Sequence, residues 1–396
     1  MAAIKIYPDL YWVGAVDWAV KSFHGHTYTT ERGTTYNAYV ILDDKVTLVD
    51  TVYGPFSDEL LKNIKELIGE RKIEYIIANH VETDHSGAIP VVLKAYPGVK
   101  VFGTEKCREG LNRHYYYKMD FQTVKTGDKL KLGKNTLTFI EAPMIHWPDS
   151  MFTYMVEDQI LLPNDAFGQH YASSERFDDE VDHCGLMEEA AKYYANILWP
   201  LSSIILKKIT DVQKMNIPIK MIAPSHGIIW RKDPMKIVNA YVSWANNTTK
   251  DKIVVVYETM WGATEKMARK ITEGLAAAGI SVKLFDINTA DRTEVIKEML
   301  DAKGFIIGSS THDNGMLPSI AGFLEFLKGL QPKNRVASAF GSYGWAGGAV
   351  KSVEGLLEEA GIETIKPGIS VKYVPDENES KLCYEFGSNF AKNLRK

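Results

Sequence analysis

The stretch His80-Val81-Glu82-Thr83-Asp84-His85 constrains the fold more than any other part of the chain, because it places two imidazoles and two carboxylates within six residues. The apolar run 75–78 precedes it, so we expect these side chains on a loop at the end of a buried strand. Imidazole and carboxylate together suit zinc, iron or manganese, with no thiolate to bias the choice. A solvated polar loop is the alternative interpretation, and the alternating spacing, which directs the side chains toward one point, argues against it.

Three further candidate ligands follow apolar strand-like runs. His146 follows residues 139–145, Asp165 follows residues 160–164, and His226 follows residues 221–225. Each one alone is better interpreted as an ordinary satisfied polar residue. Together they repeat one arrangement, a strand and then a ligand, which favours a single metal site.

The six-residue stretch resembles the metal loop of the metallo-β-lactamase superfamily, His-x-His-x-Asp-His, with Glu82 in place of the second histidine. A hard oxygen donor there favours iron over a zinc hydrolase site. The same replacement marks the flavodiiron proteins, also called A-type flavoproteins. The stretches 146–150, 164–168 and 225–227 resemble that family as well.

That resemblance implies an αββα sandwich and two irons. One iron would be held by His80, Glu82 and His146, the other by Asp84, His85 and His226, and Asp165 would bridge them. The family also implies that His24 and Tyr193 line the substrate pocket. Ordinary core packing is the alternative for Tyr193, and a catalytic part for either residue is left open. The remaining histidines are expected at the surface or behind the ligands: His114, His170 and His183.

Local patterns predict the elements of this first part. Residues 37–42 and 46–49 flank Asp43-Asp44 as a hairpin, and residues 130–132 and 137–140 form another around Gly133-Lys134-Asn135. Ser57 is expected to cap a helix with apolar positions through Ile68. Residues 187–245 are expected to form helices around the strand before His226.

After the polar break at 246–250, strands and helices alternate in a new rhythm. Apolar runs at 253–257, 282–285, 305–308, 336–340 and 369–373 predict strands, and helical patterns lie between them. Such alternation indicates a doubly wound parallel sheet. We therefore expect two domains, residues 1–250 and residues 251–396.

Ligands of doubly wound sheets bind beyond the carboxyl ends of the strands. Three loops fall there, at 258–264, 309–315 and 341–348. Glycine-rich loops that merely turn the chain are the alternative, which three such loops at one edge disfavour. The first loop can hold phosphate at the start of the following helix, and it has neither the Gly-Lys-Thr of a Walker loop nor a Gly-x-Gly-x-x-Gly fingerprint.

The first loop resembles the flavodoxin phosphate loop, except that Trp261 replaces a hydroxyl residue. The other two resemble the loops that contact the flavin ring in flavodoxins, with Tyr343 and Trp345 as stacking partners. The resemblance implies FMN as cofactor. The residues it assigns to FMN are Thr259, Met260, Trp261, Gly262, Ala263, Thr264, Ser310, Thr311, His312, Asp313, Asn314, Gly315, Ser342, Tyr343, Gly344, Trp345, Ala346 and Gly347.

The two resemblances together cover nearly the whole chain and imply a flavodiiron oxidoreductase. Such a protein passes electrons through FMN to a diiron site and reduces dioxygen to water or nitric oxide to nitrous oxide. The preferred gas is left open. Two alternatives remain: a zinc hydrolase fused to a flavodoxin, and a gas-sensing or electron-transfer module without turnover.

The composition limits the classes of partner that we expect. A net charge of −4 without a basic run argues against nucleic acid, and no apolar stretch is long enough to span a membrane. The first residues lack signal-peptide features, so we expect a cytoplasmic protein. Cys107, Cys184 and Cys383 are widely spaced, which excludes a rubredoxin-type iron site built from this sequence. We therefore expect an external electron donor, rubredoxin or another small carrier, and the family implies a head-to-tail homodimer or a dimer of such dimers.

Overall fold

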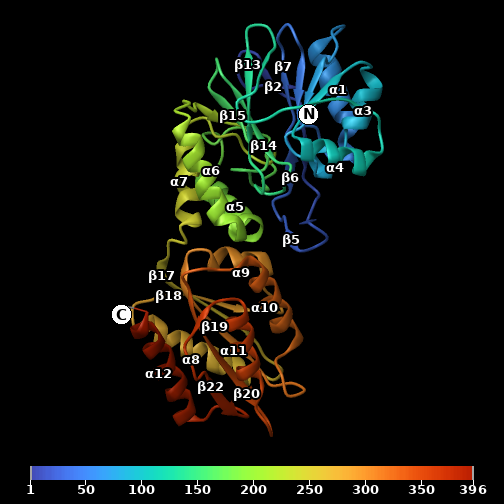
Figure 1. Ribbon diagram of the computed structural model, residues 1–396. Coiled ribbons are helices and arrows are strands. Elements are labelled where there is room, and N and C mark those ends of the chain that lie inside the picture. Colours follow the sequence, from blue (N-terminus) through green and yellow to red (C-terminus); the bar gives the residue numbers. More distant parts are fainter. Residues whose placement is uncertain (1, 395–396) are drawn as a thin grey trace. The chain divides into compact units, whose positions relative to one another are not determined.

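The computed structural model describes residues 2–394, which form two compact units (Figure 1). The first unit comprises Met1–Tyr193 and Leu201–Val242, and the second comprises Tyr194–Pro200 and Ser243–Lys396. The short segment 194–200 thus packs with the second unit. There the indole Nε1 of Trp199 donates to Asn247 Oδ1 over 3.1 Å, and Asn196 Nδ2 donates to the Thr293 carbonyl over 3.1 Å.

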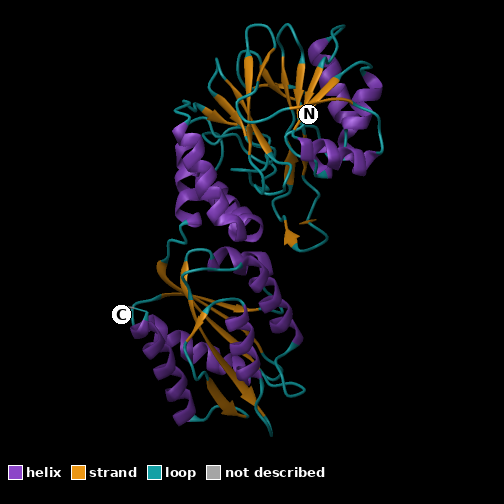
Figure 2. Cartoon of the chain, viewed as in Figure 1, coloured by secondary structure: helices purple, strands orange, loops and turns teal. Residues whose placement is uncertain are grey.

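The first unit is built on two facing sheets (Figure 2). The first sheet has the order β1-β2-β7-β8-β9-β10-β11, antiparallel up to β8 and parallel from there on. Its strands are β1 (Ile4–Lys5), β2 (Leu10–Trp12), β7 (Tyr39–Ile41), β8 (Thr47–Val49), β9 (Tyr75–Ile77), β10 (Lys100–Gly103) and β11 (Asp120–Thr123). The second sheet is β12 (Lys129–Lys131), β13 (Thr136–Glu141), β14 (Met151–Met155), β15 (Ile160–Leu162) and β16 (Met221–Ile222).

Alternation of side chains along the strands explains the layers. In β9, Ile76 packs toward one face and Ile77 toward the other, since successive strand residues point to opposite sides. Ile77 joins Phe139 and Met155 in the core between the sheets. Ile76 packs instead under helices α1 (Ser57–Ile68), α3 (Ile89–Ala95) and α4 (Glu105–Tyr115). Helix α6 (Ser202–Lys214) and helix α7 (Pro234–Ala245) up to Val242 belong to the same unit, and the architecture is an αββα sandwich, as predicted.

Smaller elements complete the unit. They are the pairs β3 (Ala15–Asp17) with β6 (Thr34–Tyr36) and β4 (Ser22–Phe23) with β5 (Tyr28–Thr29), and the helices η1 (Gly54–Phe56), α2 (Thr83–Ser86) and α5 (His183–Tyr193). The π-helix η2 (Tyr194–Leu198) and the helix η3 (Trp199–Leu201) follow α5 in the chain, but Tyr194–Pro200 belong to the second unit. The predicted cap at Ser57 is wrong: Ser57 is already helical, and its hydroxyl donates to the Gly54 carbonyl over 2.6 Å.

The second unit is a parallel sheet of order β18-β17-β19-β20-β21, in which β22 also pairs with β20. Its strands are β17 (Lys250–Glu258), β18 (Ser281–Asp286), β19 (Ala302–Ser309), β20 (Val336–Tyr343), β21 (Glu363–Thr364) and β22 (Ile369–Lys372). Its helices are α8 (Ala263–Ala277), α9 (Arg292–Met299), α10 (Pro318–Leu330), α11 (Ala349–Glu359) and α12 (Glu377–Asn393). The doubly wound prediction is confirmed, although β17 begins at Lys250, inside the predicted polar break.

Close helix packing in this unit depends on two glycines. A Cβ on Gly274 of α8 would lie 2.0 Å from the Tyr384 carbonyl oxygen of α12, and one on Gly387 would lie 2.2 Å from the Ile271 carbonyl oxygen. The carboxyl ends of β17, β19 and β20 meet at one edge of the sheet, because all three strands are parallel. The three loops predicted to bind a ligand, 258–264, 309–315 and 341–348, therefore lie side by side at this edge.

Candidate functional site

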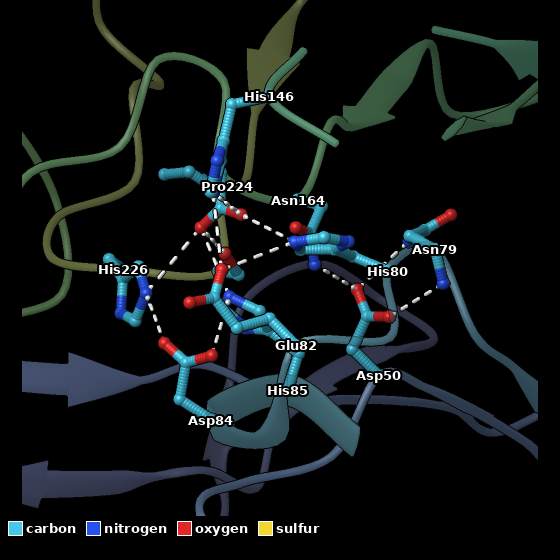
Figure 3. Close-up of polar contacts among 12 residues, drawn as sticks. Asp50, Asn79, His80, Glu82, Asp84, His85, His146, Asn164, Pro224 and His226 are labelled. Carbon is cyan, nitrogen blue, oxygen red and sulfur yellow. Dashed lines mark hydrogen bonds and ion pairs between the residues drawn. The ribbon is translucent and has the colours of Figure 1, made fainter. Parts of the chain in front are cut away.

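All seven predicted ligands lie just beyond strand ends of the sandwich. His80 follows β9, His146 follows β13, Asp165 follows β15, and His226 follows β16. The loop after β9 differs from the prediction in one respect, since Thr83–Ser86 form the short helix α2, which carries Asp84 and His85. Figure 3 shows the side chains of His80, Glu82, Asp84, His85, His146 and His226 converging from these separate segments.

The seven side chains fall into two groups able to hold a metal ion each. His80, Glu82, His146 and Asp165 form one group, and Asp84, His85 and His226 form the other. We call all seven together the ligand cluster.

Asp165 faces both groups with different oxygen atoms. Its Oδ2 lies 3.3 Å from His146 Nε2 and 3.7 Å from His80 Nε2. Its Oδ1 lies 3.0 Å from His85 Nε2 and 3.5 Å from His226 Nε2. A carboxylate placed in this way can bridge two metal ions.

Several buried atoms of the ligand cluster lack ordinary partners. Asp84 Oδ1, Asp165 Oδ2 and both ring nitrogens of His85 make no hydrogen bond to the residues that the structure describes. Buried polar groups are normally hydrogen-bonded, so each exception calls for an explanation. Bound cations, which need free lone pairs from the protein, provide one.

The charges of the ligand cluster also indicate a site for cations. Burial by itself would lower the pKa of His80, yet its hydrogen bonds to Asp149 and Glu82 raise it to about 10. Burial likewise opposes the shift of His146, whose pKa is raised to about 10 by Asp165 and Glu82. The neighbouring histidines hold the pKa of Asp165 well below its usual value, against the effect of burial. The ionised carboxylates thus favour the protonated form of the imidazoles, and metal cations would displace those protons on binding.

Partners behind the ligands fix their orientation. His80 Nδ1 donates to Asp149 Oδ2 over 3.0 Å, and the same carboxylate accepts from the Val81 amide over 2.8 Å. His226 Nδ1 donates to the Thr35 carbonyl over 2.6 Å. Both rings therefore present Nε2 to the cluster, which is the arrangement that metal-binding histidines usually show.

The two residues expected to line the substrate pocket both lie near the cluster. His24, on the turn between β4 and β5, places Nε2 3.4 Å from Glu82 Oε1, and its side chain is 35% exposed. Tyr193, at the end of α5, is buried, with its ring centroid 6.4 Å from that of His226. Burial, and then the charge of Asp165, raise the pKa of Tyr193 well above its usual value, so its phenol stays neutral.

His170 lies directly behind the ligand cluster, which is one of the two places expected for it. Its ring is buried 4.9 Å from that of His226 and 4.3 Å from that of Phe23, and its Nδ1 lies 2.8 Å from Thr34 Oγ1. Burial and then the nearby His226 lower its pKa, so the ring is neutral. Its position five residues after Asp165 was the available signal. His114 is exposed, and His183 is half-buried.

The second unit has a cavity of about 530 Å³ at the edge where the three loops meet, here called the flavin pocket. Most of the predicted residues line it: Met260, Trp261, Ala263, Ser310, Thr311, His312, Asp313, Asn314, Ser342, Tyr343, Gly344, Trp345 and Ala346. Five predicted residues do not line it: Thr259, Gly262, Thr264, Gly315 and Gly347. Tyr373 and Val374, just after β22, line it and were missed, because no glycine-rich signal marks that loop.

Thr264 acts from behind the wall of the pocket. It is fully buried, and its Oγ1 lies 2.9 Å from Ser310 Oγ and 2.8 Å from Ser342 Oγ. Helix α8 begins beside these hydroxyls without a side-chain cap, so its first amides are free for an anion. Trp261 and Trp345 at the rim of the pocket are each 91% exposed.

No helix among residues 2–394 is long and apolar enough to cross a membrane.

Comparison with known proteins matches each half of the chain to a family. Residues 34–227 match the ODP family of β-lactamases, and residues 255–387 match flavodoxin. A curated nitric oxide reductase from Moorella thermoacetica is 52% identical over 393 residues, covering 99% of this chain and 98% of that protein.

Two solved structures are similar over the full length. The rubredoxin oxygen:oxidoreductase of Desulfovibrio gigas has a TM-score of 0.96 at 38% identity, covering 99% of this chain and 98% of the other. The flavodiiron protein of Giardia intestinalis has a TM-score of 0.95 at 35% identity, covering 100% of this chain and 97% of the other.

Proposed function

Since this chain belongs to the flavodiiron protein family, we propose that its ligand cluster holds two irons, where it reduces dioxygen to water or nitric oxide to nitrous oxide. The observation that carries the assignment is Asp165, whose two oxygens face the two ligand groups separately. Four imidazoles and three carboxylates, without a thiolate, suit iron better than a zinc hydrolase site. Iron bound there would supply the electrons that the gas takes up.

The surrounding residues prepare the site for this chemistry. Asp149 orients His80, and the Thr35 carbonyl orients His226, so that the Nε2 atom of each ring points into the ligand cluster. We assign His24 and Tyr193 to the lining of the substrate pocket, on the basis of their places beside Glu82 and His226. Both gas reactions consume protons, and the neutral phenol of Tyr193 is a group that can donate a hydrogen bond there. A direct part in catalysis for either residue stays a prediction.

We further propose that FMN occupies the flavin pocket. Its phosphate would lie at the start of α8, where the amides are uncapped, and the ring would lie beside Tyr343 and Trp345. FMN can accept electrons from a carrier singly or in pairs and pass them on. The pocket is supported by the flavodoxin match over residues 255–387.

The electron donor is proposed to be a separate small protein. Of the three cysteines, Cys107 and Cys383 are buried and Cys184 is exposed, and three cannot supply the four thiolates of a rubredoxin iron. The name of the Desulfovibrio gigas relative, a rubredoxin oxygen:oxidoreductase, supports rubredoxin as that donor. The cytoplasmic location also stays a prediction.

Gas consumption by one anaerobic preparation tests the proposal. The protein is first analysed for iron and FMN, and then given reduced rubredoxin with either dioxygen or nitric oxide. We expect turnover of at least one gas, with water or nitrous oxide as product, and none from Asp165→Ala. Active protein that holds zinc and hydrolyses esters or lactams would instead support the hydrolase alternative, and tight gas binding without turnover would support a sensor.

A further inference from the structure

A second cavity lies in the first unit, outside the ligand cluster. It measures about 290 Å³ and is lined by side chains of the second sheet and of helices α6 and α7, among them Phe152, Leu161, Ile205, Ile209 and Val238. Because these residues come from both layers, the cavity is a gap between the sheet and its covering helices. The seven ligands do not line it.

One wall of this cavity is shared with the metal site. Ile145, Ala166 and Phe167 line the cavity and are almost fully buried, while their chain neighbours His146 and Asp165 point into the ligand cluster. Ala166 directly follows Asp165 in the chain, and neighbouring Cα atoms are only about 3.8 Å apart across a trans peptide. The Phe167 amide donates to the Tyr241 hydroxyl over 2.8 Å, which fixes this wall to α7.

Other residues of the lining reach solvent. Gln213 and Asn216 are exposed, and Met235 is 41% exposed, whereas the residues at the shared wall are buried. The lining of the cavity therefore includes both exposed residues and the buried wall that it shares with the metal site.

The chemistry of the lining selects its occupant. Most lining side chains are aliphatic or aromatic, and apolar cavities of even about 150 Å³ stay dry and bind xenon or benzene. A fatty acid would need a cation for its carboxylate. The lysine at the cavity, Lys208, already donates to the Glu141 carbonyl over 2.6 Å, and burial lowers its pKa. A small neutral apolar molecule fits better.

We propose that this cavity binds small apolar gas molecules and supplies them to the metal site through the wall of Ile145, Ala166 and Phe167. Dioxygen and nitric oxide are small molecules of this kind, and transfer of apolar surface out of water is favourable. The supply role rests on the proposed function, whereas gas binding by the cavity does not. The cavity would raise the local concentration of substrate beside the ligand cluster.

Xenon is the probe for the binding claim. Crystals of the iron- and FMN-loaded protein are pressurised with xenon, in the native form and in Ile209→Phe, which fills the cavity from α6. Ile204→Phe is the matched control, because Ile204 lies on the same helix, is 36% exposed and does not line the cavity. We expect xenon in the native and Ile204→Phe proteins and none in Ile209→Phe. Native crystals without xenon there, or with an elongated alkyl chain in the cavity, would overturn the proposal.

The supply claim is tested by the gas dependence of turnover. Ile209→Phe and Val212→Phe should each raise the KM for the gas by about threefold or more with little change in kcat, and Ile204→Phe should leave both unchanged. Two cavity-filling variants are used in case one of them misfolds. Iron content and melting temperature are measured for each variant. An unchanged KM in folded filling variants would refute supply through the cavity. If neither the native protein nor any variant consumes either gas, the proposed function is wrong. The xenon experiment then still decides whether the cavity binds gas.

Discussion

A single carboxylate links the two halves of the ligand cluster. Asp165 is 2% exposed and lies within 3.7 Å of imidazoles from both groups. A residue in this position balances charge on both sides at once. Its loss should therefore affect both metals rather than one.

Asp165→Ala should lose iron from both groups. The native protein should hold about two irons per chain if each ligand group binds one. In the variant we expect well under one iron, with FMN content unchanged, measured by metal analysis and by release of flavin on denaturation. Asp158→Ala, in the turn between β14 and β15, is the control and should keep its iron. A fully loaded and active Asp165→Ala protein would show that the bridge is assigned wrongly.

The flavin pocket offers a second test at one residue. Thr264→Val keeps the shape of the side chain but leaves Ser310 and Ser342 without its hydroxyl. Because these hydrogen bonds hold in place the two serines that line the pocket, their loss should raise the Kd for FMN by about tenfold, which corresponds to about 1.4 kcal/mol of binding. Iron content should not change. Fluorescence titration of the flavin-free protein measures the Kd.

Two comparisons sharpen that test. Thr272→Val removes a hydroxyl from α8 that has no hydrogen-bond partner among the described residues, so it should leave FMN affinity unchanged. The flavin released on denaturation should be FMN, and recovery of FAD by chromatography would contradict the proposal. An unaltered Kd in Thr264→Val would mean that the two serines do not depend on Thr264.

At the scale of elements, one aspartate joins the two sheets of the sandwich. Asp43 lies between β7 and β8, and its carboxylate accepts from the Asn135 amide over 2.7 Å and from the Lys134 amide over 3.2 Å, both in the turn before β13. A Cβ on Gly133 would lie 2.3 Å from Asp43 Oδ1, so the turn needs glycine there. The sequence showed both turns but not that they contact each other.

Asp43→Asn should destabilise the protein near neutral pH by about 1–3 kcal/mol, since an amide nitrogen would face backbone donors. Burial opposes the shift, but the hydrogen bonds from Asn135 and Asp44 hold the pKa of Asp43 below its usual value. A lowered folded pKa means that the native carboxylate stabilises above the unfolded pKa of about 3.9 and loses that effect as the pH falls through the folded value. The difference between native and variant in urea unfolding should therefore shrink below about pH 4.

The exposed neighbour Asp44 provides the control for this experiment. Its carboxylate faces solvent, so Asp44→Asn should unfold at nearly the same urea concentration as the native protein at every pH. A difference between native protein and Asp43→Asn that stays constant from pH 7 to pH 3 would contradict the assigned pKa shift.

The sequence predicted the order of elements and the convergence of the ligands because both depend on local signals. Apolar runs followed by His or Asp marked the strand ends, and glycine-rich loops marked the pocket in the second half. Packing across long separations gave no such signal. Tyr373 in the flavin pocket and Trp199 bonded to Asn247 became apparent only from the fold. Thr264 was among the residues assigned to FMN, and its place behind Ser310 and Ser342 could not be predicted from the loop pattern.

At the scale of the whole molecule, the ligand cluster and the flavin pocket belong to different compact units. Turnover requires one flavin pocket to face one ligand cluster, in the same chain or in a partner. The rim of the flavin pocket is unusually apolar for a free surface, with Trp261 and Trp345 each 91% exposed and Tyr373 63% exposed. Exposed apolar patches of this kind mark interaction sites, and a closed two-fold dimer is the commonest soluble assembly. We propose a head-to-tail homodimer in which each flavin serves the irons of its partner.

Complementation between two inactive chains decides whether electrons pass from flavin to iron within one chain or between two chains. One chain carries Asp165→Ala, which removes the irons and keeps the flavin. The other carries Ser342→Trp, which fills the flavin pocket, lined by Ser342, and keeps the irons. Each homodimer should be inactive, because neither contains both centres. A mixed dimer should recover up to about half of the native activity, since a two-fold dimer then has one intact flavin facing one intact iron pair. Separate affinity tags on the two chains isolate the mixed dimer, and iron and FMN are measured in it before turnover. A mixed dimer that holds one flavin and one iron pair yet shows no turnover would place both centres of the reaction within a single chain.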